Sequence, residues 1–504
     1  MRDFLCRIDA FWTRHPALFV GTAFFLGGSC SLNLHLLSLY DLLLLPFIVL
    51  LFPYWRIVWA LCLIGVALSV TSLRVQIPTE PLKKHGMLNA EVVDRHLVTI
   101  HGRQLWKLML MVHSFYSPEG TTLIRGVTLP ITVASPCPLV GGNLYQLNAS
   151  LQVDDRLMVR LRPSFGKELL APRKTMSFVE YRVKIRRVLE KIFVRLFPDH
   201  EIRQVAGGLT FGLFKDPLLQ QAMHRAGVEH VLAVSGFHFG IVAALTVFLC
   251  QGLAPISRAV VAMVCLTTYL LIIGPLPSVL RAWCAAMVAL GGICLNRRSS
   301  GINCLGVGLI ASVFYDPSTL TGIGFQLSFL ATAAILFFSR PVLSYLRTIF
   351  PVRQLHDIVD CTAADQVVLL MLGWFMPALS LLIPVFFVVC PYQLAFLQDF
   401  SLLGLVYNLL IPALFSLAMP AVLLAVLLFP LPFLPQLFAG IAQIPLQVGL
   451  LLIENAPEAS WSMVAGGVIP QTAGRILLCA VFLAGIAFKG HEDCERSDVW
   501  KACL

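Results

Sequence analysis

The chain has 504 residues, of which 58% are hydrophobic and only 13% are charged, and its mean hydropathy is +0.82. Soluble domains are roughly half apolar and a quarter charged, so this composition excludes an ordinary soluble protein and indicates a multispanning membrane protein. The net charge is +10, and most of the positive excess lies between residues 77 and 225. The 14 cysteines fall mostly inside apolar runs without CxxC spacing, which predicts neither a disulfide framework nor a metal site.

Residues 1–76 are predicted to form an amino-terminal group of membrane helices. The apolar runs cover residues 17–37, 42–52 and 57–73. The first run is too long for the core of a signal peptide, and no small-residue cleavage site with a soluble remainder follows it, so we expect a retained anchor. Arginines before the first run and between the second and third place the amino terminus in the cytoplasm. The region that follows is therefore expected to face the periplasm.

Residues 77–172 are predicted to form a soluble β domain. Short runs of strand length, many with alternating polarity, are separated by Gly, Pro, Ser and Asp clusters, and they cover residues 88–92, 97–101, 105–113, 127–133, 144–151 and 157–161. Five or six short strands predict a small OB-like barrel. Such barrels bind single strands through a basic groove and exposed aromatic rings. The candidate rings are those of Trp106, Phe115 and Tyr145, together with Tyr116 and Phe165. Each ring has a second interpretation, as part of the hydrophobic core of the barrel.

Residues 173–228 are predicted to hold an interfacial helix and a lead-in. Apolar and basic side chains alternate at helical spacing over residues 176–197, which is typical of a basic amphipathic helix lying in the membrane interface. Residues 201–227 are too mixed in polarity to cross a bilayer.

Residues 229–488 are predicted to carry the remaining spans. The first five lie at residues 231–257, 259–273, 279–295, 301–315 and 318–338. Two charge-free runs, 366–398 and 400–453, are long enough that each is expected to hold more than one helix or a re-entrant turn. A last span is expected at 476–488, ahead of a polar tail at 489–504 whose side stays open. The chain is thus predicted to be a polytopic α-helical membrane protein with about ten to twelve spans.

The stretch HVLAVSGFHFG at residues 230–240 opens the first of these five spans. Its candidate functional residues are His230, Ser235, Gly236, His238 and Gly240. Ser235 and His238 lie on one side of a helix, and Gly236 and Gly240 form a pair of small residues that lets a neighbouring helix approach. The spacing alone therefore fits either a tight helix crossing with satisfied polar groups or a Ser–His pair, and catalysis would need a third, orienting group.

Four further polar side chains lie inside predicted spans, and each has two interpretations. Arg281 follows a double-proline break and either snorkels to the interface or presents a cation to a pore. Gln326 and Ser328 sit in mid-span, where they either join helices or line a path. Asn408 has the same two interpretations: it either lines a path or serves helix packing or a polar break near Pro412.

Several of these segments occur together, and in the same order, in one family. The chain resembles the ComEC family of inner-membrane channel proteins of bacterial natural transformation, over most of residues 20–430. The resemblance rests on 230–240 and on the segments at 208–212, 225–227, 277–282, 316–317 and 324–331, and on Asn408 with Pro412. It implies an OB-like domain after the first helices, and a channel domain over 229–488 that conducts single-stranded DNA to the cytoplasm.

The implied partners are single-stranded DNA, membrane lipid, and the DNA receptor and cytoplasmic motor proteins of the uptake machinery, with a possible homo-oligomer. No metal, cofactor or catalytic residue is expected. Longer family members continue into a metallo-β-lactamase-like nuclease domain, whereas this chain ends at Leu504 and has no HxHxDH pattern, so we expect no nuclease activity in it. The competing hypotheses are a small-molecule membrane transporter and, through Ser235 and His238, an intramembrane serine hydrolase.

Overall fold

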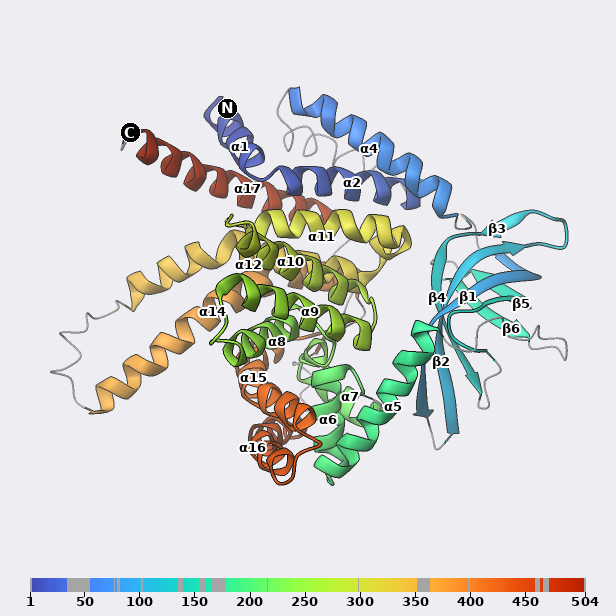
Figure 1. The fold of residues 1–504 in the computed structure, drawn as a ribbon. Coiled ribbons are helices and arrows are strands. Elements are labelled where there is room, and N and C mark those ends of the chain that lie inside the picture. Colours follow the sequence, from blue (N-terminus) through green and yellow to red (C-terminus); the bar gives the residue numbers. More distant parts are fainter. Residues whose placement is uncertain are drawn as a thin grey trace.

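The fold was analysed in a computed structural model of the chain. It describes residues 2–33, 55–76, 78, 82–100, 103–134, 139–153, 159–164, 177–214, 216–297, 299–350, 363–397, 399–457, 463–465 and 471–502. The span expected at 42–52 lies outside these residues, as do Phe165 and the start of the strand expected at 157–161. A six-stranded sheet lies at one side of a helical body, and α5 runs between the two (Figure 1).

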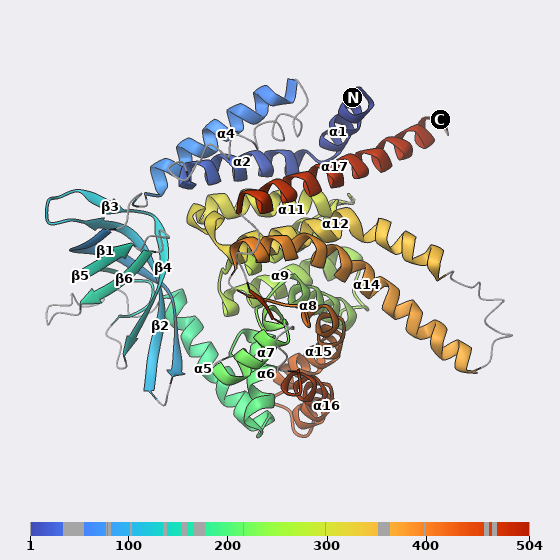
Figure 2. The ribbon, with the colours of Figure 1, turned by 180° about the vertical axis from the view of Figure 1, so that it is seen from behind.

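One group of helices in the helical body comes from both ends of the chain and from its centre. They are α1 (Arg2–Arg14), α2 (Pro16–Asn33), α4 (Trp55–Arg74), α11 (Gly301–Tyr315), η4 (Pro317–Thr321), α12 (Ile323–Ile349), α14 (Ala363–Phe396) and α17 (Gln471–Ala502). The two termini lie near each other, and α12 and α14 extend away from the side that carries the sheet (Figure 2). The packed apolar residues of α1, α2, α4, α11, α12 and α17 form one core.

A second core joins the remaining helices. They are α5 (Phe178–Leu196), α6 (His200–Phe211), α7 (Pro217–Arg225), η3 (Glu229–Val231), α8 (Gly236–Leu249), α9 (Pro255–Ile273), α10 (Pro277–Cys294), α15 (Gly404–Leu427) and α16 (Leu434–Glu454). A two-stranded ribbon of β7 (Asp399–Ser401) and β8 (Met463–Ala465) completes this part. The mixed segment 201–227 folds as the short helices α6 and α7, each begun by an aspartate whose carboxylate accepts backbone N–H groups.

The sheet is entirely antiparallel. Its strands are β1 (Leu82–Ile100), β2 (Arg103–Tyr116), β3 (Thr122–Ile124), β4 (Val127–Ala134), β5 (Leu144–Val153) and β6 (Val159–Ser164). The order is β3-β2-β1-β5-β6, with β4 also paired to β2. No pairing of β6 with β3 or β4 closes a barrel among the described residues, so the predicted antiparallel strands are confirmed and barrel closure is not.

Eight helices among the described residues are long and apolar enough to cross a membrane. They cover Arg56–Arg74, Glu229–Leu249, Pro255–Ile273, Pro277–Cys294, Ile323–Ile349, Met371–Phe396, Gly404–Leu427 and Leu434–Glu454, and Pro16–Ser29 and Gly301–Tyr315 are shorter apolar helices. The chain is therefore a polytopic α-helical membrane protein.

The two long charge-free runs behave differently. Residues 400–453 contain two helices, α15 and α16, as expected. The same prediction for residues 366–398 is wrong, because α14 is one continuous helix. Its internal prolines, Pro377, Pro384 and Pro391, are spaced by about two helical turns and so disturb hydrogen bonds on one face only.

A close helix crossing lies between α2 and α11 and not at the glycine pair that the sequence suggests. A Cβ added to Gly306 of α11 would lie 2.2 Å from the backbone carbon of Ala17, and one added to Gly21 would lie 2.7 Å from the Gly306 oxygen. A Cβ on Gly240 would meet nothing within 4 Å. The expectation that Gly240 permits a tight crossing is therefore wrong, and the small-residue contact joins α2 to α11 instead.

Candidate functional site: a buried arginine beside the central motif

The motif at 230–240 forms a helix start. After the turn of η3, the backbone is extended at Ser235, which is the N-cap of α8, and Ser235 forms a capping box with His238. The Ser235 N–H donates to His238 Nδ1 over 3.1 Å, and the Ser235 hydroxyl lies 3.2 Å from the same nitrogen. Serine is favoured at this position because it satisfies free N–H groups. The three-residue spacing of Ser and His is thus explained by capping.

The imidazole of His238 is fully buried. Its Nε2 has no hydrogen-bond partner among the described residues, although the backbone carbonyl of Leu209 lies near the ring. No carboxylate of the described residues forms a hydrogen bond or ion pair with His238. The third group that a serine hydrolase would need to orient its base is therefore missing from the described part of the chain.

Arg281 lies in the second turn of α10 and is only 8% exposed. Its Nε donates to Ser328 Oγ over 3.1 Å, and Nη1 donates to Thr332 Oγ1 over 2.7 Å. The guanidinium carbon lies 5.5 Å from the centre of the Phe329 ring. The stem of the side chain packs on Gly308, where an added Cβ would lie 3.2 Å from Arg281 Cγ. The head group is therefore held inside the bundle between α10, α11 and α12.

The partners of Arg281 are neutral, because hydroxyl groups and an aromatic ring surround it. Among the described residues, no carboxylate lies within ion-pair distance of its guanidinium. A buried cation without an anion is costly, whereas the hydrogen bonds of hydroxyl groups recover only part of that cost. The site is thus electrostatically unbalanced and has a positive charge to offer to an anion.

The central motif and Arg281 meet in space. A Cβ added to Gly236 would lie 3.9 Å from Arg281 Nη2, so this nitrogen faces the first turn of α8. At the start of α10, Ser278 Oγ donates to the Val234 carbonyl over 3.0 Å and fixes the two segments to each other. The structure therefore brings together Gly236, Arg281 and Ser328, with Ser235 and His238 on the same helix start.

Gln326 and Asn408 lie elsewhere and join helices. Gln326 Nε2 donates to the Leu320 carbonyl over 2.9 Å, and its Oε1 accepts from the Tyr392 hydroxyl, so it connects η4, α12 and α14. Asn408 Nδ2 donates to the Gly227 carbonyl over 3.2 Å, and its Oδ1 is buried without a partner among the described residues. Of the two interpretations of each residue, these contacts favour packing between helices.

His230 and Gly240 contribute nothing to the cluster that the structure describes. His230 is an exposed residue of η3, and Gly240, two residues beyond His238, is also exposed. In contrast, Thr332 and Phe329 belong to the cluster although the sequence did not single them out. Thr332 follows Ser328 by four residues, and this i, i+4 spacing on one helix face is the signal that would have found it.

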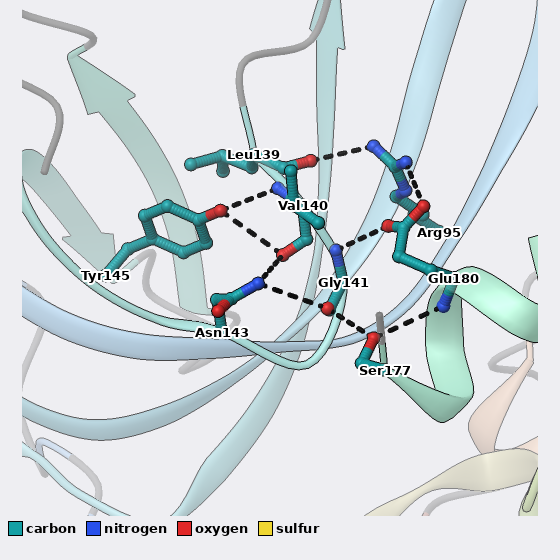
Figure 3. A network of polar contacts seen from close by, with 8 residues as sticks. All are labelled: Arg95, Leu139, Val140, Gly141, Asn143, Tyr145, Ser177 and Glu180. Carbon is teal, nitrogen blue, oxygen red and sulfur yellow. Dashed lines mark hydrogen bonds and ion pairs between the residues drawn. The ribbon is translucent and has the colours of Figure 1, made fainter. Parts of the chain in front are cut away.

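A second group of buried charges joins the sheet to the helical body, and it is balanced (Figure 3). Arg95 Nη2 of β1 lies 2.6 Å from Glu180 Oε2 of α5, and each of these side chains is 11% exposed. The other carboxylate oxygen accepts from the Gly141 N–H over 2.7 Å. Arg95 Nη1 donates to the Leu139 carbonyl, and Ser177 Oγ caps α5 while donating to the Gly141 carbonyl.

One turn further along α5, two arginines connect the sheet to a membrane helix. Arg182 and Arg186 approach the carboxylate of Asp94 at 3.2 and 3.6 Å, and they donate to the Leu271 and Ile273 carbonyls at the end of α9. Burial lowers the pKa of Arg186 from its ordinary value, and the nearby Asp94 opposes that shift. These two arginines, predicted to lie on an interfacial helix, therefore face protein and not lipid headgroups.

The aromatic residues considered for base stacking are mostly core. Trp106, Phe115 and Tyr145 are 8%, 0% and 3% exposed and pack inside the sheet domain. Tyr116 is partly exposed, and Phe165 lies outside the described residues. The three principal candidates therefore cannot present a ring face to a strand of nucleic acid.

No group of three or more His, Cys, Asp or Glu side chains that could hold a metal ion occurs among the described residues.

Comparison with known proteins gives two similarities. A family model described as "Competence protein" matches residues 215–490. ComE operon protein 3 of Bacillus subtilis (strain 168) is 30% identical over 117 residues, which is 23% of this chain and 15% of that protein. The aligned part thus spans a small fraction of this relative. No solved structure matches the chain.

Proposed function

The chain belongs to the competence protein family, and from this premise we propose that it conducts single-stranded DNA across the bacterial inner membrane into the cytoplasm during natural transformation. The observation that carries the proposal is Arg281, a buried cation that the described residues leave without a carboxylate. Arginine binds phosphate through parallel N–H donors. A phosphodiester that passes this point would supply the missing anion.

The surroundings of Arg281 fit this role. Ser328 and Thr332 hold Nε and Nη1, so Nη2 is directed toward Gly236 at the start of α8. The cost of burying an unbalanced cation falls when a polyanion enters, and the transported strand therefore gains a favourable contact inside the membrane. The helices α8, α10 and α12 meet around the charge, and we propose that the path opens between them.

Other parts of the proposal rest on the family and the sequence. The sheet domain is assigned to the periplasmic side as an OB-like domain, and a DNA receptor delivers the strand there. The chain lacks the GxxxxGK[ST] motif of nucleotide-driven motors, so a cytoplasmic motor protein or the proton gradient drives the movement. The path forms within one chain or within a homo-oligomer.

The test uses a strain that lacks the gene, complemented with variants, and measures internalised DNA separately from surface-bound DNA. Arg281→Gln is expected to reduce internalised DNA to the background of the deletion strain while surface-bound DNA and the amount of protein in the membrane persist. Arg281→Lys keeps a charge but not the paired donors, and it is expected to retain part of the uptake. The matched control is Arg340→Gln, which removes an exposed arginine from α12. Normal uptake by Arg281→Gln at normal protein level would refute the assignment.

A further inference from the structure

A basic groove opens where the sheet meets the ends of two membrane helices. Its lining includes Arg74 of α4, Met111 and His113 of β2, Arg125 between β3 and β4, and Tyr315 at the end of α11. The cavity volume is about 250 Å³, a little below the range of about 300–1,000 Å³ that is common for ligand pockets, so the feature is a shallow surface groove. We call this feature the junction groove.

The walls of the junction groove are held in place by hydrogen bonds. An isolated antiparallel bridge joins Gln76 to Arg125, with N–H to oxygen distances of 2.9 and 3.0 Å. Arg74 Nη1 donates to the Phe314 carbonyl over 2.8 Å, which connects α4 to α11. On the other side, Thr128 Oγ1 donates to the carboxylate of Asp316 over 2.9 Å. The groove is therefore a fixed junction between the sheet and the helical body.

The charges in the groove are those of an anion site. Arg74 and Arg125 are exposed, and neither forms an ion pair with a carboxylate of the described residues. His113 lies 3.5 Å from Glu91, and both side chains are about half exposed. Asp316 is buried, and its carboxylate accepts hydrogen bonds from Ser318 and Thr128. The two arginines are therefore exposed cations of the groove that have no carboxylate partner among the described residues.

An aromatic ring lies beside these arginines. Tyr315 at the end of α11 is 50% exposed, and the neighbouring Phe314 is 48% exposed. A basic groove combined with an exposed aromatic ring is the arrangement that holds single-stranded nucleic acid, since phosphates pair with the cations and a base stacks on the ring. The rings of the sheet core cannot supply this stacking, because Trp106, Phe115 and Tyr145 are buried.

We propose that the junction groove binds the phosphodiester backbone and a base of single-stranded DNA on the sheet side of the membrane helices. The inference rests on the proposed function and adds a contact point to it. The alternative occupant is an anionic lipid headgroup, which arginine and tyrosine at helix ends often contact. Arg125 favours the nucleic acid, because it belongs to the sheet and not to a membrane helix.

The experiment measures binding of a fluorescein-labelled oligothymidylate to the full chain in nanodiscs of zwitterionic lipid, by anisotropy over a series of salt concentrations. Each phosphate contact with a single strand contributes about 0.7 to the slope of log K against log salt. The double variant Arg74→Gln/Arg125→Gln is expected to bind more weakly and to reduce that slope by about 1.4. Arg162→Gln on β6, an exposed arginine of the same sheet outside the groove, is the control and should leave the slope unchanged.

A second pair of variants tests the stacking. Tyr315→Leu is expected to weaken binding by about 5- to 100-fold, because base–aromatic stacking is lost, whereas Tyr315→Phe keeps the ring and should bind as the unmodified chain does. An unchanged slope in the double variant would overturn the proposal. In a second set of nanodiscs that contain anionic lipid, a double variant that loses its enrichment of that lipid while its DNA affinity stays the same would also overturn the proposal.

Failure of the groove assignment can be distinguished from failure of the proposed transport function. If groove variants bind DNA normally while Arg281→Gln cells lose uptake, the groove assignment is wrong and transport stands. If the unmodified chain binds no oligothymidylate at any salt concentration, the groove assignment is also wrong, and the uptake measurement alone decides on transport.

Discussion

The buried ion pair between Arg95 and Glu180 is predicted to hold the sheet on α5. Glu180→Gln keeps the shape of the side chain and an acceptor for the Gly141 N–H, so it removes chiefly the charge. Breaking a buried pair by neutralising one partner costs about 3–5 kcal/mol. Arg95 retains the Leu139 carbonyl and lies 4.8 Å from the Trp106 ring, which places the expected cost at the lower end, about 3 kcal/mol.

The assay is hydrogen exchange of the full chain in nanodiscs, followed in peptides that contain Gly141 and the first turn of α5. A loss of about 3 kcal/mol in local opening free energy corresponds to exchange that is roughly 150-fold faster. The matched control is Glu119→Gln, which breaks an exposed 3.4 Å pair with Lys84. Such pairs contribute about 0–1 kcal/mol, so at most about fivefold is expected there. Equal exchange rates in the two variants would refute the prediction, because the buried Arg95–Glu180 pair would then stabilise the protein no more than the exposed pair does.

Three further predictions concern packing. Gly306→Ala should lower the amount of folded protein in the membrane, because its Cβ would lie 2.2 Å from the Ala17 backbone and overpacking costs about 1–3 kcal/mol or more. Gly240→Ala should leave that amount unchanged, because its Cβ would meet nothing within 4 Å among the described residues. Gln326→Leu should lower the thermal unfolding temperature in detergent, because it removes two hydrogen bonds between helices that each contribute about 1 kcal/mol. An unchanged unfolding temperature would argue against a role of Gln326 in joining the helices. Trp106→Ala should destabilise the sheet by about 3–5 kcal/mol, measured by protease susceptibility, whereas Trp106→Phe should be tolerated.

The sheet shows how far local pattern predicts structure. On β5 the exposed and buried residues alternate along the strand, and the sequence pattern predicted that strand closely. The runs at 88–92 and 97–101 were predicted as separate strands, yet both belong to β1. Register shifts interrupt its pairing with β2 between Asn89 and Ala90 and between Val92 and Asp94. A bulge reverses the phase of the alternation, so one bulged strand has the pattern of two.

The candidate site was predictable only in part. The motif at 230–240 and Arg281 were identified from residue type inside apolar runs, because polar groups in a membrane need partners. The partners themselves were not predictable. Ser328 and Thr332 lie 47 and 51 residues from Arg281 in the chain, and the capping role of Ser235 depends on a break between η3 and α8 that the charge-free run conceals.

The two buried charge groups differ in a way that separates structure from function. Between β1 and α5, Arg95 of the strand pairs with Glu180 of the helix, and Arg182 and Arg186 of the helix share Asp94 of the strand. Each of these buried arginines has a carboxylate partner within the described chain, so the contact is structural. Among the described residues, the polar partners of Arg281 are hydroxyl groups, and an aromatic ring lies beside it. An unpaired cation does not stabilise a structural contact, because a neutral side chain of the same size would pack there at a lower free-energy cost. The imbalance at Arg281 is useful only if an anion arrives, and the transported phosphodiester is the anion that the proposed function supplies.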